Sequence, residues 1–297
     1  MNVAGKQPVR GKLMFDEPMS KHTSWRLGGP ADRYYVPTDL QDLQDFLAGL
    51  ESDIEIVWVG LGSNLLVRDG GIRGQVIAPL NALREIRLDA DGSLYCECGV
   101  SCAKLAKFCH RQELAGADFF AGIPGTIGGA LAMNAGAFGG ETWAAVESVI
   151  MIDRRGKLVE RSAAEFEIHY RQVRLPQREW FAAARFRFDP RAPGEESNIR
   201  QLLKQRNATQ PIGEPSCGSV FKNPPGKHAA QLIEAAGLKG FCLGTACVSQ
   251  KHSNFIISRE DTTASDVEAL IEHIRQTVAN RFDVDLEPEV HIVGETL

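Results

Sequence analysis

The chain has 297 residues, of which 43% are hydrophobic, so it is long enough for two or three domains with a sizeable core. Its 33 lysines and arginines and 38 aspartates and glutamates give a formal net charge of −5, which argues against a dedicated nucleic-acid binder. The beginning of the chain contains no continuous apolar segment followed by small residues, so we expect no secretion signal there. Residues 1–19 are expected to form an N-terminal tail.

The first predicted elements lead into a glycine-containing loop. Apolar residues at helical spacing predict a helix over residues 39–50, and residues 54–59 (IEIVWV) are typical of a buried strand. The strand runs into Gly60-Leu61-Gly62-Ser63-Asn64. A dinucleotide-binding fingerprint would need a third glycine at position 65, where this chain has Leu65. We therefore interpret the loop as a phosphate-binding nest in another fold, with the serine and asparagine as additional donors.

The rest of the chain alternates short strands with a few helices, a pattern that predicts an α+β protein. Before residue 190 we expect strands at 65–67, 76–78, 86–88, 94–98, 146–153, 157–160 and 181–188, and a helix at 101–112. Residues 189–194 (DPRAPG) are typical of a linker. Beyond it we expect helices at 198–206 and 229–236 and strands at 254–258 and 289–293. Ser265 and Glu268 predict a capping box at the start of the last helix.

The most unusual segment is residues 122–140, GIPGTIGGALAMNAGAFGG, in which seven of nineteen residues are glycine. It carries no charge, but Pro124, Asn134 and the glycines interrupt it, and no second apolar segment of this kind exists, so we expect no membrane span. Glycine is used where φ is positive or where another group approaches the backbone closely. We interpret the segment as a buried loop whose N–H groups point into a cavity and wrap a large flat or anionic ligand. The alternative is a glycine-rich packing corner.

Seven cysteines stand at positions 96, 98, 102, 109, 217, 242 and 247. The first four, with His110, suggest a metal site, but their spacing matches none of the usual zinc patterns. Buried thiols also pack as small apolar groups, and this is the interpretation that we favour. We expect no metal, reduced thiols and a cytoplasmic location.

Three polar groups stand where a plain core would not place them. Arg171 follows Tyr170 before a turn, although an exposed arginine is most often only a solvated charge. Ser219 lies in the segment 217–225 (CGSVFKNPP), where glycine and two prolines restrict the backbone, so its hydroxyl could donate a proton. A capping turn before the helix at residue 229 explains that segment equally well. Glu289 lies between Pro288 and an apolar run, so burial could raise its pKa, whereas most glutamates are simply exposed.

Five motifs occur in a specific order along nearly the whole chain, from about residue 23 to 294. They are GLGSNLL at 60–66, GIPGTIGGALAMNAGAFG at 122–139, YR at 170–171, GSVFKNP at 218–224 and LEPEV at 286–290. This ordered set resembles the UDP-N-acetylenolpyruvoylglucosamine reductase family. The resemblance implies an α+β fold with a two-part FAD-binding domain of the vanillyl-alcohol-oxidase (PCMH) type and an α+β substrate-binding domain. We expect FAD-binding subdomains at 20–85 and 86–190 and a substrate-binding domain at 191–297, whose C-terminal strand returns to the active site. The short interval after Arg171 resembles the shorter type of the family.

The resemblance also implies an enzyme of peptidoglycan precursor synthesis, in which NADPH reduces non-covalently bound FAD. A hydride would pass from flavin N5 to the enolpyruvyl group of the UDP-linked sugar, and UDP-N-acetylmuramate would be formed. Ser219 would give the proton, and Arg171 and Glu289, the latter protonated, would stabilise the enolate. One departure from the family pattern is Gln172-Val173, where Asp-Ser is common, which makes the hydrogen bonds around Arg171 uncertain.

Binding residues follow from the same resemblance. FAD binding is assigned to Gly60, Gly62, Ser63, Asn64, Leu65, Gly122, Ile123, Pro124, Gly125, Thr126, Gly128, Gly129, Ala130 and Asn134. Diphosphate and uridine binding is assigned to Tyr170, Arg206, Gln210, Lys222 and Asn223. We expect a monomer that has small-molecule partners and binds neither nucleic acid nor membrane. The rival hypotheses are another flavin enzyme of the same fold, such as an oxidase, and a nucleotide-sugar binding protein without activity.

Overall fold

The computed structural model describes residues 10–174 and 178–297, and the chain forms two compact units. Unit 1 consists of the segment up to Met14, Tyr34–Gly60 and Gly74–Lys204, and unit 2 consists of Phe15–Arg33, Leu61–Arg73 and Gln205–Leu297. These divisions differ from the boundaries expected at residues 85 and 190. Composition reveals only places where a chain is locally polar or flexible, whereas here the first 73 residues alternate between the units.

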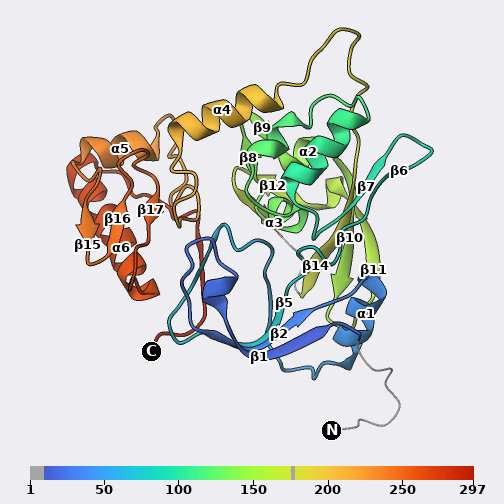
Figure 1. The fold of residues 1–297 in the computed structure, drawn as a ribbon, viewed down its shortest axis with the longest axis horizontal. Helices are drawn as coiled ribbons and strands as arrows, with labels where there is room; N and C mark the ends of the chain where they lie inside the picture. The colour runs from blue at the N-terminus through green and yellow to red at the C-terminus, as the bar shows by residue number, and fades with distance from the viewer. Residues whose placement is uncertain (1–9, 175–177) are drawn as a thin grey trace. The chain divides into compact units, whose positions relative to one another are not determined.

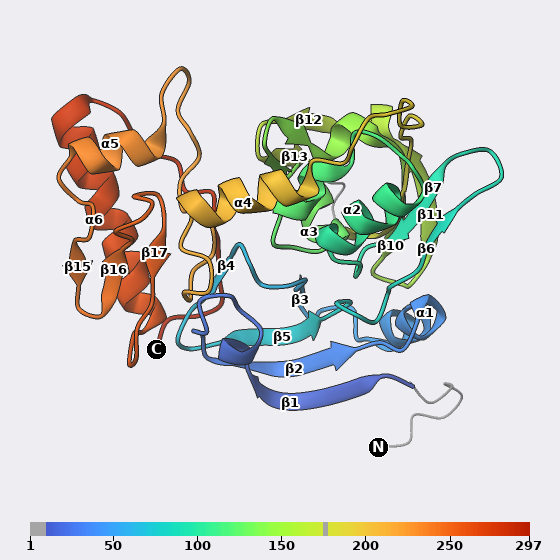
Figure 2. The same ribbon diagram turned by 45° about the horizontal axis from the view of Figure 1, so that its top comes forward.

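A four-stranded sheet carries the chain from one unit to the other. Its order is β1-β2-β5-β3, formed by Lys12–Pro18, Pro30–Val36, Ile72–Ile77 and Ile56–Trp58, and β1, β2 and β5 run side by side in Figure 2. Strand β1 lies within the expected tail, so that expectation is wrong from Lys12 onward, while residues 1–9 lie outside the described part. Helix α1 (Leu40–Gly49) follows β2, and its N-cap is Asp39, whose side chain accepts a hydrogen bond from the Asp42 N–H.

Unit 1 is built around an antiparallel five-stranded sheet. Its order is β11-β10-β14-β7-β6, formed by Leu158–Ser162, Val146–Asp153, Glu179–Phe186, Leu94–Glu97 and Ile86–Leu88. Helices α2 (Cys102–Arg111) and α3 (Ile127–Ala132) lie beside this sheet in Figure 1, and their buried side chains share one core cluster with β10 and β14. The remaining elements are the hairpins β8–β9 (Gly136–Ala137, Gly140–Glu141) and β12–β13 (Glu167–His169, Gln172–Arg174), and the 3-10 helices η2 (Asp118–Gly122), η3 (Thr142–Ala145) and η4 (Ala163–Glu165).

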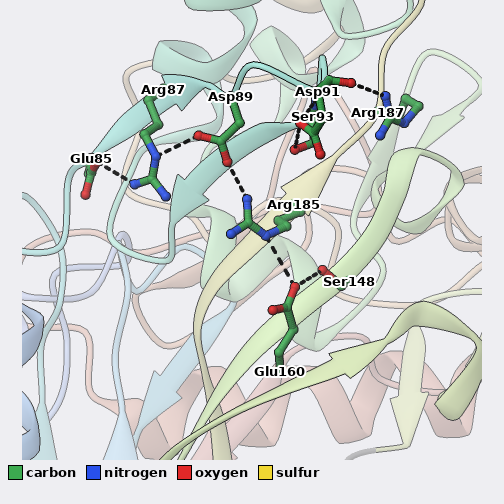
Figure 3. A network of polar contacts seen from close by, with 9 residues as sticks. All are labelled: Glu85, Arg87, Asp89, Asp91, Ser93, Ser148, Glu160, Arg185 and Arg187. Carbon is green, nitrogen blue, oxygen red and sulfur yellow. Dashed lines mark hydrogen bonds and ion pairs between the residues drawn. The ribbon is translucent and has the colours of Figure 1, made fainter.

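An ionic network covers part of this sheet (Figure 3). Arg185 on β14 contacts Asp89 and Glu160, and Arg87 on β6 bonds to Glu85 and to the same aspartate. The Arg87 guanidinium also lies 3.9 Å from the ring centre of Tyr95. Because these groups are partly exposed, their ion pairs contribute little stability each. The network instead gives the polar face of the sheet a defined side-chain arrangement.

Unit 2 packs two helices with short strands. The sheet β15-β16-β17 is formed by Cys242–Leu243, Ala246–Val248 and Ile256–Ile257. Helices α5 (Ala229–Ala235) and α6 (Ala264–Phe282) lie beside it in Figure 1, and side chains of the sheet and of both helices form one core cluster. The C-terminal strand β18 (His291–Val293) pairs in parallel with β4 (Leu65–Val67). Helix η1 (Met19–Lys21) precedes the buried Trp25, whose indole N–H donates to the Ile256 carbonyl at 2.8 Å. Helix α4 (Ile199–Thr209) carries the chain into this unit.

The start of α6 differs from the prediction. The capping box is formed by Thr263 and Asp266, two residues before the expected pair Ser265 and Glu268. Ser265 lies inside the helix, and its N–H and hydroxyl both donate to Asp69. Thr263 and Asp266 form the same kind of local pattern, so the sequence offered both pairs; it could not reveal the additional bonds to Asp69, which is 195 positions before Ala264.

The cysteines are only partly as expected. Cys96, Cys98, Cys102, Cys109 and Cys217 are free and buried, and burial raises the pKa of each thiol. Cys242 and Cys247, however, form a disulfide, so the expectation of reduced thiols is wrong for this pair. The two residues oppose each other in the β15–β16 hairpin, and it is this pairing that brings the sulfurs together. No helix in the described ranges combines the length and apolar character of a membrane span.

Candidate active site

The glycine-rich segment forms part of unit 1, and its backbone is mostly paired within the protein. After η2 the chain turns at Thr126, the N-cap of α3, whose hydroxyl accepts a hydrogen bond from the Gly129 N–H at 3.3 Å. The N–H groups of Ile127 and Gly128 donate to the carbonyls of Val100 and Cys98, both at 2.8 Å. The expectation that the N–H groups of this segment point into a cavity is therefore wrong at these positions, because both donors bond to carbonyls of residues that follow β7.

The glycines serve mainly for close packing. A Cβ at Gly122 would lie 2.3 Å from the Phe138 ring, and one at Gly140 would lie 2.5 Å from the Phe119 ring. A Cβ at Gly128 would lie 3.0 Å from Cys98 Cβ. The alternative of a glycine-rich packing corner thus describes much of this segment.

Four of the predicted cofactor residues nevertheless line one cavity of about 110 Å³ in unit 1. Its lining residues are Trp58, Gly60, Pro79, Cys98, Thr126, Gly128, Gly129, Ala132, Trp180 and Phe181. A Cβ at Gly60 would lie 2.5 Å from Thr126 Oγ1, so glycine is what keeps these two walls in close approach. The two tryptophan rings stack with centroids 5.8 Å apart.

One residue of the cavity wall has an unused donor. Trp58 Nε1 is buried and has no hydrogen-bond partner among the described residues. A buried polar group without a partner is costly, and such groups in native proteins often meet a ligand. Sequence reasoning missed both tryptophans, although Trp58 stands only two residues before Gly60. The cavity is too small for a whole dinucleotide, and its wall combines aromatic rings, closely approaching backbone and a residue with an unpaired donor.

The second predicted cofactor loop belongs to unit 2. Gly62 has φ +66°, and a Cβ there would lie 2.0 Å from the His22 carbonyl oxygen, so glycine is required. Within the described part of unit 2, no acceptor takes a hydrogen bond from the N–H groups of Leu61, Gly62 or Ser63. Consecutive free N–H groups around a left-handed residue are typical of an anion-binding nest. Asn64 is held differently, since its Nδ2 donates to the Glu289 carbonyl at 2.9 Å.

Ser219 and Glu289 lie on neighbouring extended segments of unit 2. The Glu289 N–H donates to the Val220 carbonyl at 2.7 Å, and the Lys222 N–H donates to the Glu287 carbonyl at 2.9 Å. Val220 and Phe221 are buried and anchor the segment just after the serine. Burial first, and the charge of Glu289 second, raise the pKa of the Cys217 thiol nearby. The structure thus pairs the backbone segment that carries the predicted proton donor with the segment that carries the predicted carboxyl group.

The predicted substrate residues of unit 2 have mixed environments. Lys222 Nζ is paired with Glu287 at 2.6 Å, and Asn223 Oδ1 accepts the Ala229 N–H at 3.0 Å, so the capping-turn alternative is confirmed for the asparagine. Arg206 Nε donates to Gln210 at 3.1 Å, and burial lowers the pKa of its guanidinium. No carboxylate in the described ranges forms an ion pair with Arg206, which leaves its charge available to an anion.

Arg171 belongs to unit 1, at the tip of the β12–β13 hairpin. It has φ +55°, and its guanidinium donates to the carbonyls of Asn134 and Gly136, at 3.3 and 2.9 Å, while lying 4.9 Å from the Tyr170 ring centre. Asn134 itself bonds to Glu141, to the His169 carbonyl and to the Trp143 N–H. Its amide therefore holds the arginine loop together.

The remaining predicted binding residues are mostly apolar residues of strands, turns and helices. Leu65 is the first residue of β4, Ile123 to Gly125 form the turn between η2 and α3, and Ala130 is buried on α3. Tyr170 is exposed. Of the predicted catalytic residues, Arg171 belongs to unit 1, and Ser219 and Glu289 belong to unit 2.

Comparisons with known proteins identify two family domains in the chain. Residues 31–162 match an FAD binding domain, and residues 210–293 match the C-terminal domain of UDP-N-acetylenolpyruvoylglucosamine reductase. The UDP-N-acetylenolpyruvoylglucosamine reductase of Alkalilimnicola ehrlichii is 55% identical over 99% of both chains, and that of Methylococcus capsulatus is 53% identical over 97% of this chain and 95% of its own.

A solved structure is also similar to this chain. The crystal structure of the reductase from Thermus caldophilus has a TM-score of 0.81 at 28% identity and covers 96% of this chain and 99% of its own. These matches confirm the α+β fold with an FAD-binding domain of the vanillyl-alcohol-oxidase type, and they confirm FAD as the cofactor. The chain belongs to the UDP-N-acetylenolpyruvoylglucosamine reductase family and is an FAD-dependent oxidoreductase.

Proposed function

We propose that the protein is an NADPH-dependent UDP-N-acetylmuramate dehydrogenase that acts in the cytoplasm as a monomer. Its substrate would be UDP-N-acetylglucosamine enolpyruvate, and its product would be a precursor of peptidoglycan. The identity of 55% over 99% of a reductase supports the substrate class. The location rests on the chemistry of a nucleotide-sugar substrate and no longer on the cysteines, two of which are bonded.

FAD would be held without a covalent bond by two groups of residues. In unit 1, the cavity around Trp58, Gly60 and Thr126 offers flat apolar walls and an unpaired indole N–H. In unit 2, the free N–H groups of residues 61–63 suit the negative charge of the diphosphate. When bound, FAD carries a hydride from NADPH to the terminal carbon of the enolpyruvyl group.

The other half of the reduction is a proton transfer by the protein. The double bond of the enolpyruvyl ether takes up one hydride and one proton, and the Ser219 hydroxyl would supply the proton to the neighbouring carbon. The pairing of Val220 with Glu289 carries this assignment, since it places the hydroxyl donor and the carboxyl group on adjacent segments. Glu289 and Arg171 would stabilise the negative charge that develops on the substrate carboxylate. The arginine is preorganised for this by its two backbone carbonyl contacts.

Substrate binding would use the charged groups near these segments. Arg206 is partly buried, and no carboxylate within residues 10–174 and 178–297 pairs with it, so an incoming diphosphate would supply a counter-charge. Gln210 orients it through its side-chain oxygen. Lys222, Asn223 and Tyr170 would complete the contacts to the diphosphate and uridine.

The serine assignment is tested with Ser219→Ala in anaerobic half-reactions. We expect NADPH to bleach the flavin at nearly the wild-type rate and the enolpyruvyl substrate to restore the flavin band about 100- to 10,000-fold more slowly, since a positioned general acid is lost. Ser216→Ala, in the same loop and bonded only to a backbone carbonyl, is the matched control and should behave as the wild type. Equal rates in Ser219→Ala and the wild type would reject the assignment.

The same experiment separates the rival functions. A protein that bleaches with NADPH but recovers only when air is admitted would be an oxidase. A protein that binds the UDP-sugar but shows no flavin band after reconstitution with FAD would be a binding protein.

A further inference from the structure

The segment that carries Ser219 is held from a second side by one buried side chain. Asn254, just before β17, is only 4% exposed. Its Oδ1 accepts the Phe221 N–H at 3.0 Å, and its Nδ2 donates to the Phe221 carbonyl at 2.8 Å. Its own backbone carbonyl accepts the Val220 N–H at 2.8 Å. Three hydrogen bonds from one residue therefore fix the two positions that follow the serine.

These bonds replace a strand that the fold does not supply. On its other side the segment bonds to the backbone around Glu289, through the carbonyl of Val220 and the N–H of Lys222. A carboxamide has the same donor and acceptor pair as a peptide group, so Asn254 completes the pattern of a three-stranded sheet with a single side chain. Phe221 is 1% exposed, and without Asn254 its N–H and carbonyl would be left buried and unpaired.

Asn254 is itself supported by its neighbour His252, whose Nδ1 accepts the Asn254 N–H at 3.3 Å. Burial lowers the pKa of His252, and the neutral ring can act as an acceptor. The imidazole also packs against Phe255 with ring centroids 4.8 Å apart. The side chain of Asn254 thus has a supported backbone position, and its carboxamide is directed at the serine segment.

We propose that Asn254 is a positioning residue for the proton transfer: it holds the backbone beside Ser219 so that the hydroxyl stays in register with Glu289. The inference rests on the proposed function, in which Ser219 is the proton donor. Asn254 takes no part in the chemistry, since its polar atoms are used by Phe221. Its removal should therefore affect the step that needs the serine and spare flavin reduction by NADPH.

The test uses the FAD-bound holoenzyme in anaerobic half-reactions. Asn254→Ala should leave bleaching by NADPH within about twofold of the wild type and slow reoxidation by the enolpyruvyl substrate by about 100-fold, the cost typical of a displacement near 1 Å. The double variant Ser219→Ala/Asn254→Ala should be no slower than Ser219→Ala alone, because a residue that acts through the serine has no effect without it. Hydrogen exchange should also show faster exchange of the Phe221 amide in Asn254→Ala.

Ser258→Ala is the matched control, since Ser258 is equally buried in unit 2 and bonds to the Trp25 carbonyl instead of the serine segment. It should lower the melting temperature without changing either half-reaction. If Asn254→Ala does not fold, Asn254→Asp keeps the size and the acceptor, and should show the same selective slowing.

The outcomes are distinct. Equal slowing of both half-reactions, or multiplied losses in the double variant, would show that Asn254 is merely structural and would overturn the proposal. Wild-type reoxidation in Asn254→Ala would overturn it too, while a slow Ser219→Ala would leave the proposed function intact. If Ser219→Ala itself reoxidises at the wild-type rate, the serine assignment fails, and Asn254 has no proton transfer to position.

Discussion

A larger residue in place of Gly60 is expected to destabilise the protein because of one neighbour, Thr126. An ideal Cβ at residue 60 would lie 2.5 Å from Thr126 Oγ1 but 3.4 Å from Thr126 Cβ, so the clash is with the end of the side chain only. The hydroxyl cannot simply rotate away, because it caps α3 by accepting the Gly129 N–H. Gly60→Ala should therefore disturb both the cavity wall and the helix cap.

The magnitudes follow from these contacts. Loss of the cap alone, as in Thr126→Ala, costs about 1 kcal/mol. The extra methyl in a filled space adds about 1–2 kcal/mol, so Gly60→Ala should lose about 2–3 kcal/mol in the free energy of unfolding. In the double variant the methyl meets only an alanine Cβ, and the loss should return to about 1 kcal/mol. Independent effects would instead add to about 3–4 kcal/mol.

The assay is urea unfolding, with and without saturating FAD. The difference between the two conditions reports the change in FAD affinity, since a ligand stabilises only the state that binds it. For unfolding without FAD, Gly129→Ala is the matched control: its Cβ would lie 3.7 Å from Thr126 Oγ1, and its position in α3 favours alanine, so no loss of stability is expected. Additive losses in the Gly60→Ala/Thr126→Ala variant would refute the reasoning.

Two further predictions concern Trp58 and His252. Trp58→Phe removes a buried donor that has no partner in the described ranges, so the stability of the FAD-free protein should stay the same or rise. The affinity for FAD, measured by quenching of flavin fluorescence, should fall about 5- to 10-fold. An unchanged affinity would show that the indole N–H does not contact FAD. Burial lowers the pKa of His252 in the folded protein, so below about pH 6.5 the unfolded chain binds more protons than the folded one. The free energy of unfolding should therefore decrease as the pH decreases, by at most about 1.4 kcal/mol per pH unit. His252→Gln should show a smaller loss between pH 7.5 and 5.5 in urea unfolding, and an equal loss would contradict the prediction.

Local patterns predicted the elements that local interactions build. Strands β4 and β6 have the expected bounds, and each is a short run rich in leucine, isoleucine or valine next to turn residues. Helix α3 was not expected, since six residues beginning Ile-Gly-Gly have poor helix propensity. It forms because the cap at Thr126 and the carbonyls of Val100 and Cys98 take its first N–H groups. Such contacts depend on the sheet, which no window of sequence contains.

The sequence predicted the residues of the candidate site but not the neighbouring residues that hold them in position. Ser219 and Glu289 stood out because polar groups between prolines and apolar residues need a reason. Asn254 gave no such signal, because an asparagine before a strand is an ordinary turn residue. Its role follows only from the extended segments themselves: the serine segment finds one backbone partner at Glu289, and its open side needs a second. A catalytic side chain is therefore positioned in part by buried polar residues outside its motif, such as Asn254, that bond directly to the backbone of the motif.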